Sequence, residues 1–327
     1  MIRMITLFAA LGERLRDFGS DAAAQRLVRR AVQANPWFTD EEVCRSLRTI
    51  AAEMLQPQRL EQWLSAYPLP AAQPRRILVV MAGNIPAVGF FDLLCVLCSG
   101  HTCLCKPSSK DEVLMDYLIS LLQELAPGLP LERYDGTAKV DAVIATGSDA
   151  AERHFRAHYA GLPLLLRGSR RSVAVLSGAE TPQQLDGLAD DIWSYSGLGC
   201  RNVSLIFAPE GFHPQLQVPK VNSKYQNNYR QTKALLQLTG LPYVDLGSAL
   251  LVEQPAFPKP LCEIAVARYR SLDEVAAWLE QHDREIQCVV SECLPHPRRT
   301  GFGQAQAPAL TDWPDGVDVL AWLAGLA

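Results

Sequence analysis

The feature that most constrains the fold is an alternation of short apolar runs with helical segments, which begins at residue 77. Residues 77–81 (Ile-Leu-Val-Val-Met) are apolar without interruption, as expected for a strand buried on both faces of a parallel sheet. A helical pattern follows over residues 87–98 and a second short strand over 102–106. Because strands and helices alternate, we predict a doubly wound parallel α/β sheet. Right-handed crossovers would then place the loops that follow the strands along one edge.

The alternation continues over most of the chain. The further elements that the pattern predicts are helices at 109–126, 149–158, 182–196 and 272–282, and strands at 140–146, 163–166, 172–177, 203–207 and 286–290. Residues 109–112 (Ser-Lys-Asp-Glu) have capping-box spacing, so we expect one helix to begin there. Residues 1–67 have a helical pattern, with Thr39 placed to cap a helix after the interruption at Asn35-Pro36. The proline-rich residues 68–76 connect this helical segment to the sheet.

The composition and charge of the chain argue against several classes of protein. The 327 residues are 48% hydrophobic and 20% charged, which suffices for about two domains with a sizeable core. The net charge of -4 provides no basic field for nucleic acid or an anionic membrane surface. No apolar run reaches the roughly 18 residues of a membrane span, and the first residues lack a signal-peptide pattern. Nine scattered cysteines favour a reducing cytoplasm, so we expect a cytoplasmic enzyme.

Cys200 is the first candidate for chemistry. It lies between Gly199 and Arg201, just past the end of the helix expected at 182–196. A thiol in such a loop is reachable, and a helix N-terminus or a nearby cation would make its thiolate available as a nucleophile. Free cysteines are mostly buried small hydrophobes, and that interpretation suits the other eight.

Four further cysteines lie close together in the sequence. Cys95, Cys98, Cys103 and Cys105, with His101 among them, have a spacing that a zinc site could use. However, the first two lie in an apolar helix and the last two on one face of a strand that we expect to be buried. Core packing explains them better, so we expect no metal.

Polar residues follow three of the expected strands. Asn84 lies in the turn Gly83-Asn84-Ile85-Pro86, where an amide can donate to an oxyanion or simply cap the local backbone. Residues 106–109 (Lys-Pro-Ser-Ser) suit a ribose or phosphate, although a solvated lysine is equally compatible. Gly147-Ser148 opens a helix, whose N-terminal amides favour phosphate in any sheet of this kind.

The order of these motifs along the chain resembles that of a known protein family. In chain order they are Gly83-Asn84-Ile85-Pro86, the segment from Gly100 to Ser109, Thr146-Gly147-Ser148, the segment from Arg167 to Ser172, and Gly197-Leu198-Gly199-Cys200. Together they resemble the aldehyde dehydrogenase superfamily, and within it the acyl-CoA reductase branch typified by LuxC. The resemblance spans roughly residues 77–323, and the tail motifs at 301–304 and 315–318 are similar to C-terminal stretches of that branch.

The resemblance implies a domain organisation and a set of site residues. It places a helical segment and an NAD(P)-binding domain in residues 1–168, a catalytic domain in 169–310 and a C-terminal segment in 311–327. It makes Cys200 the nucleophile and the Asn84 amide half of an oxyanion hole, with the backbone N–H of Cys200 as the other half. The residues that it assigns to the cofactor are Met81, Lys106, Ser108, Ser109, Thr146, Gly147 and Ser148. Among these, Lys106 would hold the adenine-side ribose, and the turn at 147–148 would lie beneath the pyrophosphate and nicotinamide.

Three departures from the superfamily pattern refine the expectation. Residues 165–168 (Leu-Leu-Arg-Gly) lack the general-base glutamate that releases an acid, so a thioester on the enzyme would persist until hydride or a thiol arrives. Ser109 replaces the usual glutamate of the Lys-Pro motif and stands beside Lys110. This removes repulsion of a 2′-phosphate and favours NADPH, with NADH as the alternative. The usual Glu-x-Phe-Gly-Pro segment is not recognisable, and Glu263 has no assigned role.

The expected function is therefore the NADPH-dependent reduction of an acyl thioester, from fatty acyl-CoA or an acyl-carrier protein, to the aldehyde through acyl-Cys200. One alternative is an oxidative aldehyde dehydrogenase that activates water with another carboxylate. The other is a non-catalytic nucleotide- or acyl-binding subunit. A homo-oligomer or a complex with an acyl-activating partner is compatible with each. The polar residues 220–233 would dock such a partner or a CoA arm, or form a solvated helix face.

Overall fold

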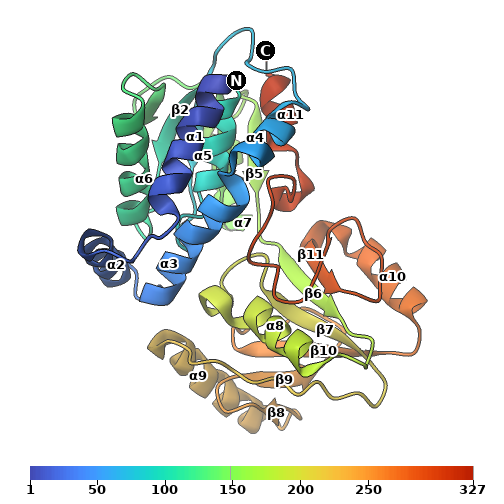
Figure 1. The fold of residues 1–327 in the computed structure, drawn as a ribbon. Helices are drawn as coiled ribbons and strands as arrows, with labels where there is room; N and C mark the ends of the chain where they lie inside the picture. The colour runs from blue at the N-terminus through green and yellow to red at the C-terminus, as the bar shows by residue number, and fades with distance from the viewer. Residues whose placement is uncertain (148, 327) are drawn as a thin grey trace. The chain divides into compact units, whose positions relative to one another are not determined.

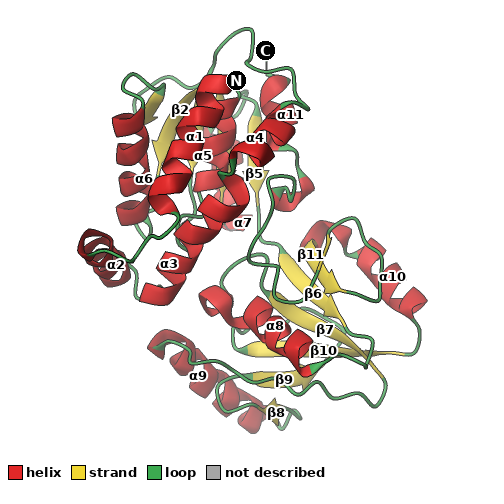
Figure 2. Cartoon of the chain, in the orientation of Figure 1, coloured by secondary structure: helices red, strands yellow, loops and turns green. Residues whose placement is uncertain are grey.

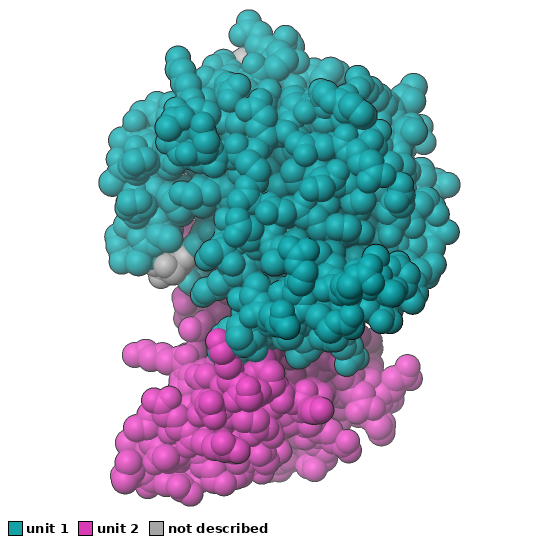
Figure 3. Space-filling view, turned by 90° about the vertical axis from the view of Figure 1, so that its left-hand side faces the viewer, with its two compact units in different colours: residues 1–169, 309–327 teal, residues 170–308 magenta. Residues whose placement is uncertain are grey.

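The chain divides into two compact units. The computed structural model describes residues 1–147 and 149–326. Unit 1 comprises residues 1–169 and 309–327, and unit 2 comprises residues 170–308 (Figure 3). The C-terminal helix therefore belongs to the same compact unit as the N-terminal helices.

Unit 1 is built on a five-stranded parallel sheet with the order β3-β2-β1-β4-β5. The strands are β1 (Arg76–Val80), β2 (Thr102–Lys106), β3 (Leu131–Arg133), β4 (Ala142–Thr146) and β5 (Leu164–Arg167). The chain moves outward from β1 to β3 on one side and then returns to build β4 and β5 on the other. This is the doubly wound α/β topology that the alternating pattern predicts, and that prediction is confirmed.

Helices cover both faces of this sheet (Figures 1 and 2). They are α1 (Ile2–Leu15), α2 (Ala22–Ala34), α3 (Asp40–Thr49), a π-helical turn (Ile50–Met54), α4 (Pro57–Leu64), α5 (Phe90–Cys98), α6 (Glu112–Leu125), α7 (Asp149–His158) and α11 (Val319–Ala324). As predicted, the Thr39 side chain caps α3 by accepting a hydrogen bond from the N–H of Glu42.

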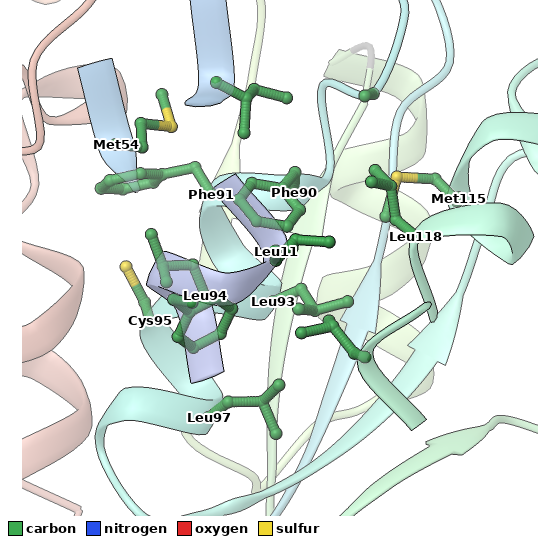
Figure 4. Close-up of a cluster of buried hydrophobic side chains, with 14 of the residues drawn as sticks. Leu11, Met54, Phe90, Phe91, Leu93, Leu94, Cys95, Leu97, Met115 and Leu118 are labelled. Atoms are coloured by element: carbon green, nitrogen blue, oxygen red, sulfur yellow. The ribbon is translucent and has the colours of Figure 1, made fainter. Parts of the chain in front are cut away.

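The apolar runs of the strands are explained by burial on both faces. Ile77 and Val79 pack into the large core formed with the N-terminal helices, α5 and α6, while Leu78 packs into a second core on the opposite face. Figure 4 shows the large core around α5, with Leu11 of α1 beside Phe90. A strand with a helical layer on each side has no solvated face, so its sequence shows no polar alternation.

Unit 2 contains a seven-stranded sheet with the order β12-β11-β6-β7-β10-β9-β8. Its strands are β6 (Arg171–Val175), β7 (Val203–Pro209), β8 (Val244–Asp245), β9 (Leu250–Glu253), β10 (Glu263–Tyr269), β11 (Ile286–Ser291) and β12 (Arg299–Thr300). All pairs are parallel except β8 with β9. Its helices are α8 (Pro182–Trp193), α9 (Ser223–Thr239) and α10 (Leu272–Gln281).

The capping-box prediction at 109–112 is wrong. Helix α6 begins at Glu112, and Asp111 occupies the position before it without capping it. The Asp111 carboxylate instead accepts a hydrogen bond from the N–H of Ala87, a contact 24 residues away in sequence. A complete capping box forms at α8, between Thr181 and Gln184. In residues 1–147 and 149–326, no helix combines the length and apolarity needed to cross a membrane.

Unit 1 depends on the packing of α1 against α5. Phe8 is fully buried and meets Phe90 edge-on, with ring centroids 6.3 Å apart. We predict that Phe8→Ala lowers the free energy of unfolding by about 3–5 kcal/mol, because the truncation leaves a cavity. Ile2 on the same helix is 82% exposed, so Ile2→Ala should change the free energy of unfolding by less than about 0.5 kcal/mol. Urea unfolding measures both, and equal effects would contradict this packing.

Candidate active site

The candidate cofactor residues of unit 1 lie at one edge of its sheet. Lys106 ends β2 directly opposite Val80 at the end of β1, and Thr146 ends β4 opposite Arg167 at the end of β5. The Lys106 side chain is exposed and Thr146 is partly exposed. The carboxyl ends of parallel strands are where open α/β sheets bind ligands.

The turn after β1 presents Asn84 on an anchored backbone. Asn84 is exposed, whereas the neighbouring Gly83 is buried. The amide nitrogen of Asn35, a buried residue after α2, donates to the carbonyl oxygen of Gly83 at 3.2 Å. The turn closes at Ala87, which has a left-handed φ of 55°. A non-glycine residue keeps such a conformation only where its surroundings hold it.

Two further side chains hold the same turn from α3 and α6. The Ser46 hydroxyl donates to the carbonyl of Pro86 at 2.7 Å, and the N–H of Ala87 donates to the Asp111 carboxylate at 2.8 Å. Burial raises the pKa of Asp111, and the hydrogen bond from Ala87 only partly opposes this. The second carboxylate oxygen of Asp111 is buried and has no hydrogen-bond partner.

Close packing fixes the chain between this turn and the end of β2. A Cβ placed on Gly83 would stand 2.7 Å from both the Cβ and the hydroxyl oxygen of Ser108, so only glycine fits there. A Cβ on Gly89 would likewise stand 2.7 Å from Met81, whose side chain is buried. The Met81 side chain therefore packs inside unit 1. Ser109, in contrast, is exposed to solvent.

The turn after β4 is only partly described. The N–H of Gly147 donates to the carbonyl of Arg167 at 3.1 Å, and α7 begins at Asp149. Ser148, which we predict to contact the cofactor, lies outside the described residues. The position of Gly147 between a strand and a helix is the one in which backbone amides suit a phosphate.

Arg167 and Asp92 form a buried ion pair at this edge. The two guanidinium nitrogens lie 2.6 and 2.7 Å from the two carboxylate oxygens, and each side chain is at most 7% exposed. Burial opposes the guanidinium charge, but the charge of Asp92 and its hydrogen bonds, together with Asp315 and Cys95, outweigh this and raise the pKa of Arg167. The segment 165–168 thus carries a neutralised arginine and no carboxylate.

In unit 2, Cys200 is set apart from the other thiols. All nine cysteines lie in the described residues, and among them only Cys200 is exposed. It follows a short turn, Ser194–Gly197, and precedes β7. Cys200 therefore lies at the amino end of its strand, whereas the unit 1 candidates follow theirs.

Buried side chains that sequence reasoning missed hold the Cys200 loop. The Ser172 hydroxyl, on β6, donates to the carbonyl oxygen of Cys200 at 2.9 Å. The side chain of Asn202 accepts a hydrogen bond from the N–H of Gly199 at 2.8 Å. Ser172 ends the motif at 167–172 without a role assigned to it, and Asn202 belongs to no motif, so the contacts of these two residues in the structure reveal what they hold.

The four clustered cysteines lie in the core. Cys95 and Cys98 are buried on α5, and Cys103 and Cys105 are buried on β2 with their sulfurs 3.5 Å apart. Burial raises the pKa of the Cys95, Cys98 and Cys103 thiols. Protonated thiols in an apolar layer behave as small hydrophobes.

Glu263 and the residues 220–233 also have structural partners. Glu263 is buried at the start of β10, accepts a hydrogen bond from the Gln254 amide at 2.8 Å, and has a pKa that burial raises. Much of 220–233 lies in α9, and Lys233 forms an ion pair with Asp245 at 2.6 Å.

Asp111 gives the turn after β1 a predictable pH dependence. Because its native pKa is raised, the native state holds this proton at pH values where the unfolded chain has lost it. Stability from this group is complete below about pH 4 and is lost as pH rises through the native pKa. We predict that Asp111→Asn gains stability relative to the wild type as pH rises over that range. Urea unfolding at a series of pH values measures this difference.

Asp135 supplies a control of opposite sign. Hydrogen bonds from the N–H groups of Thr137 and Ala138 lower its pKa. Asp135→Asn should therefore lose stability relative to the wild type as pH rises from acid to neutral. A constant difference between Asp111→Asn and the wild type across pH would contradict the raised pKa of Asp111.

Solved structures with the same fold are aldehyde dehydrogenases. An acetylating aldehyde dehydrogenase from Geobacillus thermoglucosidasius is 10% identical with a TM-score of 0.64, covering 94% of this chain and 83% of that chain. A propionaldehyde dehydrogenase from Clostridium phytofermentans is 12% identical with a TM-score of 0.62, covering 94% and 82%. An NAD-dependent aldehyde dehydrogenase from Sinorhizobium meliloti is 12% identical with a TM-score of 0.64, covering 88% and 69%. At these identities the likeness shows the fold, which is the one that the motif order predicts.

Sequence comparison identifies the family. No curated protein matches the chain. The family model described as acyl-CoA reductase (LuxC) matches residues 36–217, which is more than half of the 327 residues. The predicted resemblance is confirmed. The chain therefore belongs to the LuxC family of acyl-CoA reductases, which are oxidoreductases that act on acyl and aldehyde groups.

Proposed function

We propose that this protein reduces an acyl thioester, from fatty acyl-CoA or an acyl-carrier protein, to the aldehyde with NADPH through an acyl-Cys200 intermediate. The observation that carries this proposal is the exposure of Cys200, alone among nine cysteines, on a loop held by hydrogen bonds to the side chains of Ser172 and Asn202. A reachable thiol on a fixed backbone is what nucleophilic catalysis requires. Family membership supplies the reaction class.

In the proposed mechanism, Cys200 is the nucleophile and Asn84 stabilises the oxyanion that forms on the acyl group. The Cys200 thiolate attacks the acyl carbon and forms a C–S bond, and the carbonyl electrons move to the oxygen. The Asn84 amide and the backbone N–H of Cys200 donate hydrogen bonds to this oxyanion. The C–S bond to the donor thiol then breaks, and that thiolate takes up a proton as it leaves. Acyl-Cys200 remains as a thioester.

Reduction completes the cycle. Bound NADPH supplies a hydride to the carbonyl carbon of acyl-Cys200. The resulting hemithioacetal oxygen is held by the same two donors, and its collapse breaks the bond to sulfur. The aldehyde leaves and the Cys200 thiolate is restored, so two electrons have passed from NADPH to the acyl carbon.

Several described residues of unit 1 suit a nicotinamide dinucleotide. Lys106 and Ser109 are exposed at the carboxyl end of β2, and the missing side chain of Gly83 allows the backbone to approach Ser108 closely. The N–H of Gly147 is engaged by the Arg167 carbonyl, so the contribution that we propose for Gly147 is the close approach of the pyrophosphate that its missing side chain allows. Together with Met81, Thr146 and Ser148, these are the residues that we propose for the cofactor.

Local charge favours NADPH over NADH. Ser109 carries no charge and has Lys106 and Lys110 on either side in the sequence. The nearest acids on α6, Glu112 and Asp116, both form ion pairs with Arg133. With those carboxylates paired, a 2′-phosphate would meet net positive charge there.

Segment 165–168 supports the reductive direction that we propose. This segment provides no carboxylate to activate water, and Arg167 is engaged by Asp92. A thioester on Cys200 then survives until hydride reaches it. Free thiols throughout the chain support our further proposal that the protein works in the cytoplasm.

The two proposed catalytic residues give distinct kinetic phenotypes. We predict that Cys200→Ala abolishes acyl-CoA reduction, because no acyl-enzyme can form. Asn84→Ala should lower kcat by about 100–1,000-fold, the usual loss for one oxyanion donor. Oxidation of NADPH with a panel of acyl-CoAs, followed by absorbance, measures both. Intact-mass detection of an acyl adduct on Cys200 without NADPH tests the intermediate.

Cys44→Ala is the control for the loss of a thiol. Cys44 is half-buried in unit 1, on α3. Its variant should reduce acyl-CoA at the wild-type rate. Near-normal reduction by Cys200→Ala would refute the assignment, and formation of acid from aldehyde without added thiol would establish the oxidative reaction instead.

Ser109 tests the cofactor proposal. We predict that Ser109→Glu raises KM for NADPH at least tenfold, because a carboxylate there repels the 2′-phosphate. The KM for NADH should change little or fall, since its ribose hydroxyls can donate to the new carboxylate. Initial rates with the two cofactors give the comparison. An equal change for both would show that Ser109 does not face the 2′ position.

A further inference from the structure

The backbone before Cys200 follows an unusual path. Tyr195, Ser196 and Gly197 have consecutive left-handed φ values of 54°, 55° and 68°. For residues with a Cβ this region is sterically unfavourable, so a run that includes two of them needs strong local support. Tyr195 and Ser196 are buried, which rules out a turn that simply relaxes into solvent.

The buried Asn202 amide supports this turn from the end of α8, and the Asn222 amide donates to the Ser196 hydroxyl within the turn at 2.9 Å. The Asn202 side chain is 4% exposed, and its amide nitrogen lies 3.1, 3.1 and 2.9 Å from three carbonyl oxygens at the end of α8 and the start of the turn. Those carbonyls belong to Asp191, Ile192 and Ser194. Carbonyls at a helix C-terminus have no partner within the helix. Here the two N–H groups of one side chain are shared among three of them, and the Gln306 amide also donates to the Asp191 carbonyl at 3.3 Å.

The same residue also closes the loop that carries the thiol. The backbone N–H of Asn202 donates to the carbonyl of Gly199 at 3.1 Å, and the Asn202 side-chain oxygen accepts from the N–H of Gly199 at 2.8 Å. Cys200 and Arg201 are therefore the two central residues of a four-residue turn that is closed by both backbone and side chain.

Other contacts extend this support without replacing it. The Ser172 hydroxyl donates to the Cys200 carbonyl at 2.9 Å and accepts from the N–H of Cys288 at 3.2 Å. The Asp191 carboxylate accepts from the N–H groups of Gly303 and Ala305 at 2.7 and 2.9 Å, which ties the end of α8 to the tail segment. Asn202 bonds to both sides of the left-handed turn, to Ser194 before it and to Gly199 after it.

We propose that Asn202 is the positioning residue for Cys200. Its amide holds the end of α8 on one side and Gly199 on the other, so it sets the direction of the Cys200 thiol and of the Cys200 backbone N–H. This inference rests on the proposed role of Cys200 as the nucleophile. It assigns to Asn202 the geometry on which attack and oxyanion binding both depend.

Position 202 needs a side chain that both donates and accepts hydrogen bonds, which an amide does. An alanine at 202 would leave three buried carbonyls and the N–H of Gly199 without this partner. An aspartate has the same shape but offers no donor, and it would set negative charge against three carbonyl oxygens. Asn202→Asp therefore removes the proposed function while keeping the volume of the side chain.

The decisive experiment compares Asn202→Ala and Asn202→Asp with the wild type in two assays. In the first, kcat for acyl-CoA reduction should fall by about 100-fold while KM changes less than about threefold, as for a misplaced reacting group. In the second, the pH profile of Cys200 alkylation by iodoacetamide should differ from that of the wild type. This second assay needs neither acyl substrate nor cofactor.

Gln56→Ala is the matched control. Gln56 is a half-buried residue just before α4 whose side-chain amide donates to the Ala51 carbonyl at 2.8 Å, and it belongs to unit 1, whereas the Cys200 turn belongs to unit 2. Its variant should leave both assays unchanged. If the Asn202 variants do not fold, Ser172→Ala should move both assays in the same direction by a smaller factor, because it removes one bond to the Cys200 carbonyl.

The outcomes separate the two proposals. A folded Asn202 variant with wild-type kcat and an unchanged alkylation profile would overturn the positioning role. If the wild type forms no acyl adduct and reduces no acyl-CoA, the proposed function fails. A changed alkylation profile in the Asn202 variants would then still show that Asn202 directs the thiol.

Discussion

Both candidate loops depend on the same interaction, a buried amide or carboxyl side chain hydrogen-bonded to the main chain of a left-handed turn. In unit 1, Asn35 and Asp111 bond to the two ends of the turn that carries Asn84. In unit 2, Asn202 bonds to both sides of the turn that precedes Cys200. Backbone polar groups cannot remain unpaired when buried, so a loop that leaves regular structure needs side-chain partners. Where those partners are buried and close-packed, the loop has one conformation, and an exposed group on it has one direction.

The candidate loops of the two units lie at opposite ends of the strands next to them. In unit 1, the candidate residues follow β1, β2 and β4, which is where the parallel topology collects loops. In unit 2, Cys200 precedes β7 and is fixed by the end of α8. The general rule for parallel sheets therefore accounts for Lys106 and Thr146 but not for Cys200. The position of the thiol follows from the way one helix ends, which is a local property of this chain.

The sequence predicts the fold well because its main signals are local. The apolar run at 77–81 and the motif order identify the doubly wound sheet and the family, both of which are confirmed. The capping pattern mispredicts the start of α6. The Asp111 side chain accepts a hydrogen bond from the N–H of Ala87, which is distant in sequence, and does not cap α6. The seven-residue strand β10 was missed because it opens on a charged residue, Glu263, after a proline-rich stretch. The role of Asn35 could not be predicted for the same reason, since it acts 48 residues from its partner. Asn202 is close to its partners in sequence, but no motif marks it.

The ion pair of Arg167 with Asp92 links the fold to the chemistry. An isolated buried charge is costly, and a bidentate pair removes most of that cost while leaving no free carboxylate to accept a proton. Asp92 satisfies Arg167 with both oxygens, so this acid is not available as a base. In an enzyme that holds its substrate as a thioester, a free base beside the acyl carbon would divert the intermediate to hydrolysis. On the function that we propose, a segment that combines a neutralised arginine with apolar neighbours would leave the acyl-enzyme to decay slowly, so that hydride transfer has the time that it needs.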